Sequence, residues 1–204
     1  MDQGLFITFE GVEASGKSTQ AEALARFFGT RALLTREPGG TLLGQRVREI
    51  LLDAATTPIP EVEALLFLAD RAQHLHEVVR PALAAGRLVI SDRYQDSSVA
   101  YQAVGRGLGE LVTSVFRHIG GLAPDLTILI DLDMDLALDR LRARGAANRL
   151  DEEAPAFHGR VRQAFLDMAR ASPERFEVFD GAVDEVTLAG QIAARVKQRL
   201  GPRL

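Results

Sequence analysis

Short runs of apolar residues alternate along the chain with longer stretches whose apolar positions recur every three or four residues. The first run, residues 5–9, reads LFITF and is rich in β-branched and aromatic side chains. A short run that is apolar at most positions is typical of a parallel strand buried on both faces of a sheet. We therefore predict strands at residues 5–9, 32–35, 88–91, 126–132 and, from a weaker pattern, 176–179.

The stretches between these runs have helical periodicity, and residues 18–28, for example, place Ala21, Leu24 and Phe28 on one side of a helix. Alternating strands and helices favour an α/β fold, in which helices cover both faces of a parallel five-stranded sheet. Ligands bind such sheets at the carboxyl ends of the strands, so functional residues should follow the strands. The predicted helices span residues 18–28, 42–53, 61–85, 97–104, 108–120, 135–144, 155–171 and 184–200.

A glycine-rich segment between the first strand and the first helix fits G-x-x-x-x-G-K-[ST], the P-loop of many nucleotide-binding proteins. Its glycines let backbone N–H groups approach phosphate oxygens at the positive end of the helix. The lysine adds a cation for the β- and γ-phosphates, and the final hydroxyl, on Ser18, is a ligand for Mg²⁺. We predict a fold of the P-loop NTPase type that binds ATP and Mg²⁺ through Gly11, Val12, Glu13, Ala14, Ser15, Gly16, Lys17, Ser18 and Thr19.

Composition and charge narrow the class of protein. With 204 residues, 47% of them apolar and 25% charged, the chain suits one globular domain over residues 1–204. The net charge of −4 argues against binding to nucleic acid polymers. The lack of cysteine excludes disulfides, thiolate nucleophiles and cysteine-zinc sites. Because no apolar run approaches the ~20 residues that span a bilayer, we predict a cytoplasmic protein without membrane contact.

One predicted helix carries a second candidate site. Phe67, Arg71 and His74 are spaced i, i+4 and i+7, and they form a stripe beside the apolar stripe that includes Leu68 and Leu75. A ring beside a guanidinium suits a pyrimidine, because the ring stacks on the base and Arg71 donates to a carbonyl on its edge. The alternative places Phe67 in the core and Arg71 in a surface ion pair, and the helical pattern alone favours this alternative.

Polar residues also follow the predicted strand at residues 88–91. Asp92 and Arg93 come at the end of that strand, where ligands of α/β proteins collect. Two pairs spaced i, i+4 then project from one side of the next helix, namely Ser97 with Tyr101 and Ser98 with Gln102. Helix capping is the alternative, but it explains only one of these four residues.

Together with the P-loop, four segments resemble the thymidylate kinase family. They are residues 35–40 (TREPGG), 66–74, 91–102 and 148–151, and they follow the order and spacing of that family over essentially the whole chain. The segment at 91–102 combined with the helix of Phe67 and Arg71 is more specific to this group than the P-loop is. The resemblance implies transfer of the γ-phosphoryl group of Mg·ATP to the 5′-phosphate of dTMP by a homodimer.

The resemblance also implies roles for matching residues. Phe67 and Arg71 would contact thymine, and Tyr101 would lie against the sugar, where a ring disfavours a 2′-hydroxyl. Arg48 and Arg93 would hold the acceptor phosphate, which paired guanidiniums match well. The acceptor-binding residues implied in this way are Glu13, which would accept from the 3′-hydroxyl, Arg36, Arg48, Phe67, Arg71, Arg93, Ser97, Ser98, Tyr101 and Gln102.

Catalysis would then depend on charge rather than on a base. An acceptor phosphate, with a second pKa of about 6, is already an anionic nucleophile near neutral pH. Lys17, Asp92 and Arg93 would act beside Mg²⁺, with Asp92 preferred over Asp131 as the acidic partner of the metal. We expect a lid at about residues 142–154, because this segment lacks apolar periodicity.

The P-loop position that carries a catalytic arginine in some members of the family is Ala14 in this chain. The lid would therefore supply that charge, from Arg149 or, as second choice, from Arg144, which we also expect among the ATP-binding residues. Arg140 and Arg142 also fit a solvated helix face. Two other functions remain open, namely a P-loop kinase for another nucleotide or deoxynucleoside, and a non-catalytic switch that binds ATP.

Overall fold

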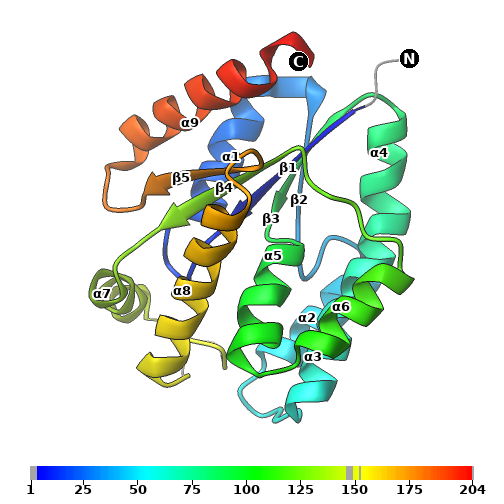
Figure 1. Ribbon diagram of the computed structural model, residues 1–204, viewed down its shortest axis with the longest axis vertical. Helices are drawn as coiled ribbons and strands as arrows, with labels where there is room; N and C mark the ends of the chain where they lie inside the picture. Colours follow the sequence, from blue (N-terminus) through cyan, green and yellow to red (C-terminus); the bar gives the residue numbers. More distant parts are fainter. Residues whose placement is uncertain (1–3, 146–148, 152, 204) are drawn as a thin grey trace.

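The computed structural model describes residues 4–145, 149–151 and 153–203 (Figure 1). Five strands form one sheet in which all neighbouring strands are parallel. Their order is β2-β3-β1-β4-β5, and they span Leu5–Glu10 (β1), Ala32–Arg36 (β2), Leu88–Asp92 (β3), Leu126–Asp131 (β4) and Phe176–Asp180 (β5). The predicted five-stranded parallel sheet is confirmed, with every strand within one residue of its expected bounds.

Helices fill the connections between the strands. They are α1 (Lys17–Phe28), η1 (Gly29–Arg31), α2 (Leu42–Leu52), α3 (Pro60–His74), η2 (Leu75–Val79), α4 (Arg80–Ala84), α5 (Gln95–Ser98), η3 (Val99–Gly105), α6 (Gly109–His118), α7 (Met134–Arg144), α8 (Pro155–Ala171), α9 (Glu185–Leu200) and η4 (Gly201–Arg203). In the described part of the chain, no helix is long and apolar enough to cross a bilayer.

The alternation of side chains along β1 explains why both faces of the sheet are covered. Leu5, Ile7 and Phe9 belong to a core that β1, β3 and β4 form with α1 and α9. Phe6 points to the opposite face, where η2 and α4 cover it, and η3 and α8 cover the same face over β4. Every residue of β1 is buried, so the strand that leads into the P-loop lies rigidly at the centre of the domain.

The register of the strands brings three connections to one edge. Asp92 at the end of β3 pairs with Phe9 of β1 on one side and with Arg36 of β2 on the other. The P-loop, the loop after β2 and the start of α5 therefore begin side by side. Figure 1 shows α2, α3 and α5 beyond this edge, below the sheet in the view.

Two predicted helices are not regular α-helices. The one predicted over residues 61–85 contains the π-helical segment η2, which leads into α4 just before Pro81. Proline lacks an N–H and its ring clashes with the carbonyl four residues earlier, so the wider π turn is favoured there. The one predicted over residues 97–104 starts at Gln95 and is mostly the π-helical segment η3.

Candidate active site

The P-loop connects the buried end of β1 to the first turn of α1. Gly11 has φ 146°, and a Cβ there would lie 2.4 Å from the carbonyl oxygen of Ile130, so a larger residue does not fit. The N-cap of α1 is Gly16, which offers no side-chain cap, so in the described part of the chain the first-turn N–H groups are suited to binding an anion. Nζ of Lys17 donates to the Val12 carbonyl at 3.1 Å, and burial, with Arg93 nearby, lowers the pKa of Lys17.

Ser18 and Asp92 offer oxygen atoms suited to a magnesium ion. Oγ of Ser18 donates to Oδ2 of Asp92 at 2.5 Å, while the buried Oδ1 of Asp92 has no hydrogen-bond partner among the described residues. Mg²⁺ prefers such oxygens and takes its other ligands from phosphates and water. Asp131, the alternative acid, has both oxygens occupied by Arg162 at 2.8 and 3.0 Å. The geometry therefore favours Asp92.

Arg93 lies between the P-loop and η3. Its backbone has φ 71°, a left-handed conformation that is uncommon outside glycine. The guanidinium donates to Glu13 at 2.6 Å, to the Gly11 carbonyl at 3.1 Å and to Oγ of Ser97 at 2.9 Å, and it lies over the ring of Tyr101. Burial alone would lower the pKa of Arg93, but Glu13 and other acidic neighbours raise it. Arg93 is thus a fixed cation beside the phosphate loop.

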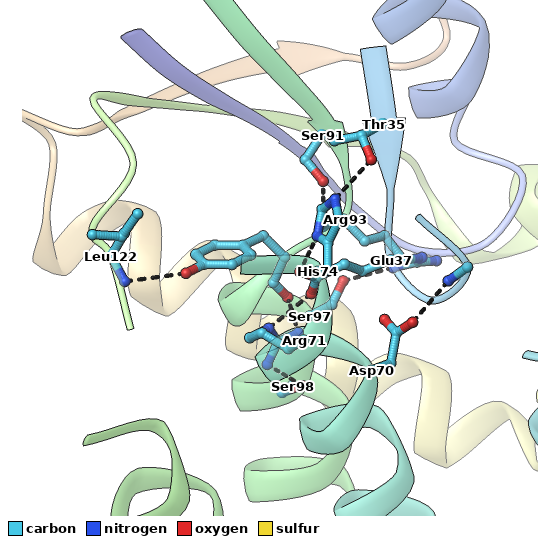
Figure 2. Close-up of polar contacts among 12 residues, drawn as sticks. Thr35, Glu37, Asp70, Arg71, His74, Ser91, Arg93, Ser97, Ser98 and Leu122 are labelled. Carbon is cyan, nitrogen blue, oxygen red and sulfur yellow. Dashed lines mark hydrogen bonds and ion pairs between the residues drawn. The ribbon is translucent and has the colours of Figure 1, made fainter. Parts of the chain in front are cut away.

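A second, more deeply buried group lies on α3 (Figure 2). Arg71 donates from Nε to Glu37 at 2.8 Å, from Nη1 to Oγ of Ser98 at 2.9 Å and from Nη2 to the Tyr94 carbonyl at 2.8 Å. Only 2% of Arg71 is exposed, which rules out the surface ion pair that the helical pattern favoured. His74 does not line the ligand pocket as its spacing suggested, and it hydrogen-bonds Glu37 from behind Arg71 instead.

These groups open into one pocket. Its lining includes the predicted catalytic residues Lys17, Asp92 and Arg93, and Ser18 at the same end. All ten predicted acceptor-binding residues line it too, namely Glu13, Arg36, Arg48, Phe67, Arg71, Arg93, Ser97, Ser98, Tyr101 and Gln102. The fold thus brings together residues spread from position 13 to position 102, while their contacts with a ligand stay predictions.

Three arginines, Arg36, Arg48 and Arg93, lie close together at the phosphate end of this pocket. Arg48 donates to the Pro38 carbonyl at 3.1 Å, and burial lowers its pKa, as do Arg36 and Arg93 nearby. Like charges at short range repel, and an anion placed among them relieves that repulsion. The arrangement therefore suits a phosphate.

A separate cleft opens on the other side of the P-loop, between α1 and the loop that follows β5. It is lined by Ser15, Gly16, Thr19, Gln20, Arg140, Gly181, Val183, Glu185 and Leu188. Arg140 donates to the Gly181 carbonyl at 2.9 Å, so this exposed side chain lines the cleft while it stays accessible to solvent. No local pattern predicts this placement, because residues 140 and 181 meet only through the fold.

Comparison with known proteins agrees with this geometry. The sequence model of the thymidylate kinase family matches residues 9–188. The chain is 50% identical over 204 residues to a thymidylate kinase from Deinococcus radiodurans, covering 98% of this chain and 99% of that protein. A thymidylate kinase from Carboxydothermus hydrogenoformans is 49% identical over 184 residues, which is 88% of this chain and 90% of the relative. The chain belongs to the thymidylate kinase family.

A solved structure supports the same assignment. The crystal structure of the thymidylate kinase from Ehrlichia chaffeensis superposes with a TM-score of 0.76 at 33% identity. The similarity covers 96% of this chain and 99% of that one, so the whole fold is shared. The P-loop kinase fold expected from the sequence is confirmed.

In this thymidylate kinase family member, the predicted lid arginine, Arg149, contacts α2 and α3 rather than the P-loop. Arg149 donates to the buried Glu63 at 2.7 Å and to the Leu51 carbonyl at 3.2 Å. Arg106 binds the same carboxylate at 3.1 Å. Burial alone would raise the pKa of Glu63, but the two guanidiniums lower it. The side chain of Arg144, our second choice, lies outside the described residues.

Sequence reasoning missed Glu10, the last residue of β1. It is fully buried and accepts from the Tyr94 N–H at 2.8 Å and from Oγ of Ser97 at 2.6 Å. Burial, with Asp96 nearby, raises the pKa of Glu10 to about 8. The one available signal was an acidic residue at the end of an otherwise apolar strand, immediately before the P-loop.

Proposed function

We propose that this chain transfers the γ-phosphoryl group of ATP to the 5′-phosphate of dTMP, giving dTDP and ADP for dTTP synthesis. The observation that carries the proposal is the single pocket that joins Lys17 and Arg93 to Phe67 and Arg71. A P-loop alone would serve many nucleotide-binding proteins. A pocket that has a phosphate-binding end and a stacking surface suits a nucleoside monophosphate as acceptor.

We expect the acceptor to bind in one orientation, with its phosphate and its base at opposite ends of the pocket. Arg36, Arg48 and Arg93 form the cationic end, where a 5′-phosphate would gain charge-assisted hydrogen bonds. Phe67 and Arg71 form the other end, where a ring stacks on a pyrimidine and a guanidinium donates to its carbonyl. Tyr101 is buried against Arg93 between these ends and would limit space at the sugar.

The chemistry requires positioning and charge more than proton removal. The acceptor phosphate has a second pKa of about 6, so no base is needed near neutral pH. Lys17 would neutralise charge on the donor phosphates, and Arg93 would do so between the two substrates. The family uses Mg²⁺ with ATP, and Ser18 and Asp92 would hold the ion, which when bound offsets phosphate charge. Glu13, beside Arg93, would accept from the 3′-hydroxyl.

The lid remains part of the proposal. We place it at about residues 142–154, of which 146–148 and 152 lie outside the described residues. Arg149 would supply the transition-state cation, and to do so it must leave Glu63 and the Leu51 carbonyl. The proposed single domain over residues 1–204 includes this segment.

We also propose a homodimer with α2 and α3 at the interface. These helices pack against each other and expose Leu43, Ile50, Val62 and Leu65, apolar residues that a partner would cover. Sedimentation at several concentrations should show a dimer, and Leu65→Asp should weaken it. Val186→Asp, at an exposed apolar position on α9, is the matched control.

The proposed location is the cytoplasm. The proposed reaction consumes ATP and a nucleoside monophosphate, so we expect the protein in the compartment that supplies both. Fractionation of cells that express the tagged protein tests this expectation, and recovery in the membrane fraction would contradict it.

A coupled assay of ADP release tests the proposed function. Purified protein with Mg·ATP is offered dTMP, dUMP, dCMP, AMP or thymidine in parallel. We expect the highest kcat/KM with dTMP. A preference for another acceptor would refute the substrate, and ATP binding without transfer to any acceptor would refute the enzymatic activity.

A further inference from the structure

Arg71 is held by the protein in a way that leaves part of it for a ligand. A guanidinium has five N–H groups, and three of those of Arg71 are used by Glu37, Ser98 and the Tyr94 carbonyl. The side chain is 2% exposed yet lines the acceptor pocket. The two remaining N–H groups are therefore oriented by the three fixed ones.

Among these three partners, only Glu37 is charged. Charge-assisted hydrogen bonds are about twice as strong as neutral ones, so Glu37 contributes most to fixing the guanidinium. Glu37 is itself 4% exposed and lies in the loop after β2, whereas Arg71 belongs to α3. A buried arginine that loses its carboxylate keeps an uncompensated charge and turns toward other acceptors.

Glu37 is in turn held by a chain of hydrogen bonds behind it (Figure 2). Its Oε1 lies 2.7 Å from Nδ1 of His74, whose Nε2 lies 2.7 Å from Oγ1 of Thr35. A carboxylate oxygen only accepts, so Nδ1 of His74 carries hydrogen, and in the neutral ring Nε2 accepts from the Thr35 hydroxyl. His74 is fully buried, so this chain gives Glu37 a single orientation.

We propose that Glu37 is a positioning residue for pyrimidine selectivity, which acts by orienting Arg71 and is itself oriented by His74 and Thr35. The inference rests on the proposed function, in which Arg71 donates to a carbonyl of thymine. Cytosine carries an amino group at the corresponding place, and a donor facing a donor leaves both unpaired. Sites built on buried hydrogen bonds discriminate strongly for this reason.

The test compares dTMP with dCMP in steady-state kinetics of Glu37→Gln, which keeps the size of the side chain and removes its charge. We expect kcat/KM for dTMP to fall about tenfold or more, chiefly through KM, because a small misplacement of a binding group is costly. The value for dCMP should change much less, so the dTMP:dCMP ratio falls. Arg71→Gln removes the guanidinium itself, so its dTMP:dCMP ratio is the lowest value that loss of Glu37 could produce by this mechanism.

Asp70→Asn is the matched control. Asp70 is also a buried acid, adjacent to Arg71 in α3, but its carboxylate accepts from the Gly39 N–H at 3.0 Å rather than from Arg71. A change in stability without a change in the dTMP:dCMP ratio is expected. Thr35→Val provides a milder variant, because it removes only the far end of the chain of hydrogen bonds and should lower the ratio by a few-fold.

The outcomes separate the two proposals. If the wild-type protein does not prefer dTMP over dCMP, the proposed function fails first. If Arg71→Gln loses the preference while Glu37→Gln keeps it, the role of Glu37 is overturned and the proposed function stands. If Glu37→Gln does not fold, the dTMP:dCMP ratio of Thr35→Val tests the inference instead. A ratio equal to that of the wild type would overturn the inference.

Discussion

The two ends of the acceptor pocket differ in how completely the protein satisfies its own polar groups. At the base end, Arg71, Glu37 and His74 are almost fully buried, and each has at least one protein partner within 3 Å. At the phosphate end, Ser18 is exposed, and Oδ1 of Asp92 lacks a hydrogen-bond partner in the part of the chain that the structure describes.

This difference indicates that the base end serves to recognise the acceptor, whereas the phosphate end serves the transfer reaction. A preorganised end binds its ligand equally in the ground state and the transition state, so changes there should alter KM. Groups that gain partners only from reacting phosphates stabilise developing charge, so changes there should alter kcat. Substitutions at the two ends should therefore change different kinetic constants.

Replacement of Lys17 tests the phosphate end most directly. We expect Lys17→Ala to lower kcat about 10³-fold or more, since the cation that offsets charge on the donor phosphates is lost. KM for dTMP should change little. The chain's other lysine, Lys197 on α9, is exposed, and Lys197→Ala is the control with unchanged kinetics. If Lys17→Ala raised KM and left kcat unchanged, the assignment of the phosphate end to the transfer reaction would be wrong.

Arg149 sharpens the comparison because it is paired with Glu63 of α3 but is proposed to act at the phosphate end. We expect Arg149→Ala to lower kcat about 10²-fold to 10³-fold, as for other transition-state arginines. Arg106→Ala is the matched control for Arg149→Ala, since both arginines bind the carboxylate of Glu63. Equal increases in KM for both variants, with kcat preserved, would show that Arg149 only holds the lid segment to α3.

Phe67 tests the base end. Stacking of a base on an aromatic ring is worth about 1–3 kcal/mol, so Phe67→Ala should raise KM for dTMP by roughly 5-fold to 150-fold. The value of kcat should stay within a few-fold of wild type. Phe27→Ala, at a half-exposed ring on α1, is the control. A fall in kcat without a rise in KM would contradict the assignment.

Glu10 lies between the base end and the phosphate end of the pocket, since its hydrogen-bond partners contact Arg71 and Arg93. Its titration should have a small effect, on the free energy of unfolding. Its partner Tyr94 accepts from Arg71, and its partner Ser97 accepts from Arg93. The folded pKa of about 8 lies above the ordinary value of 4.5, so the folded state keeps this proton longer than the unfolded state does. The resulting stabilisation is complete below about pH 4.5 and is lost as the pH rises towards 8.

Urea unfolding of the wild type and Glu10→Gln between pH 5 and 8.5 measures this loss. The wild type should lose stability relative to the variant as the pH rises, by at most about 1.36 kcal/mol per pH unit from this group. Parallel curves for the two proteins would show that Glu10 does not titrate in this range.

Local patterns made the sheet and the P-loop predictable. Gly11 to Ser18 are adjacent in sequence, and strand and helix periods are visible within a few residues. The hydrogen-bond partners of Arg71 were not predictable in this way, because Glu37 and Ser98 lie 34 and 27 positions away in the sequence. The same holds for Arg149 and Glu63, separated by 86 positions. Their pairing follows from the order of the strands, which no local pattern specifies.

One helix, α3, carries two kinds of surface. Val62 and Leu65 face outward, where the proposed second subunit would pack, while Arg71 on the same helix lines the acceptor pocket. Subunit association and acceptor affinity would then be thermodynamically linked, and linkage is reciprocal. Dilution that separates the subunits should weaken dTMP binding, and saturation with dTMP should favour association by the same factor.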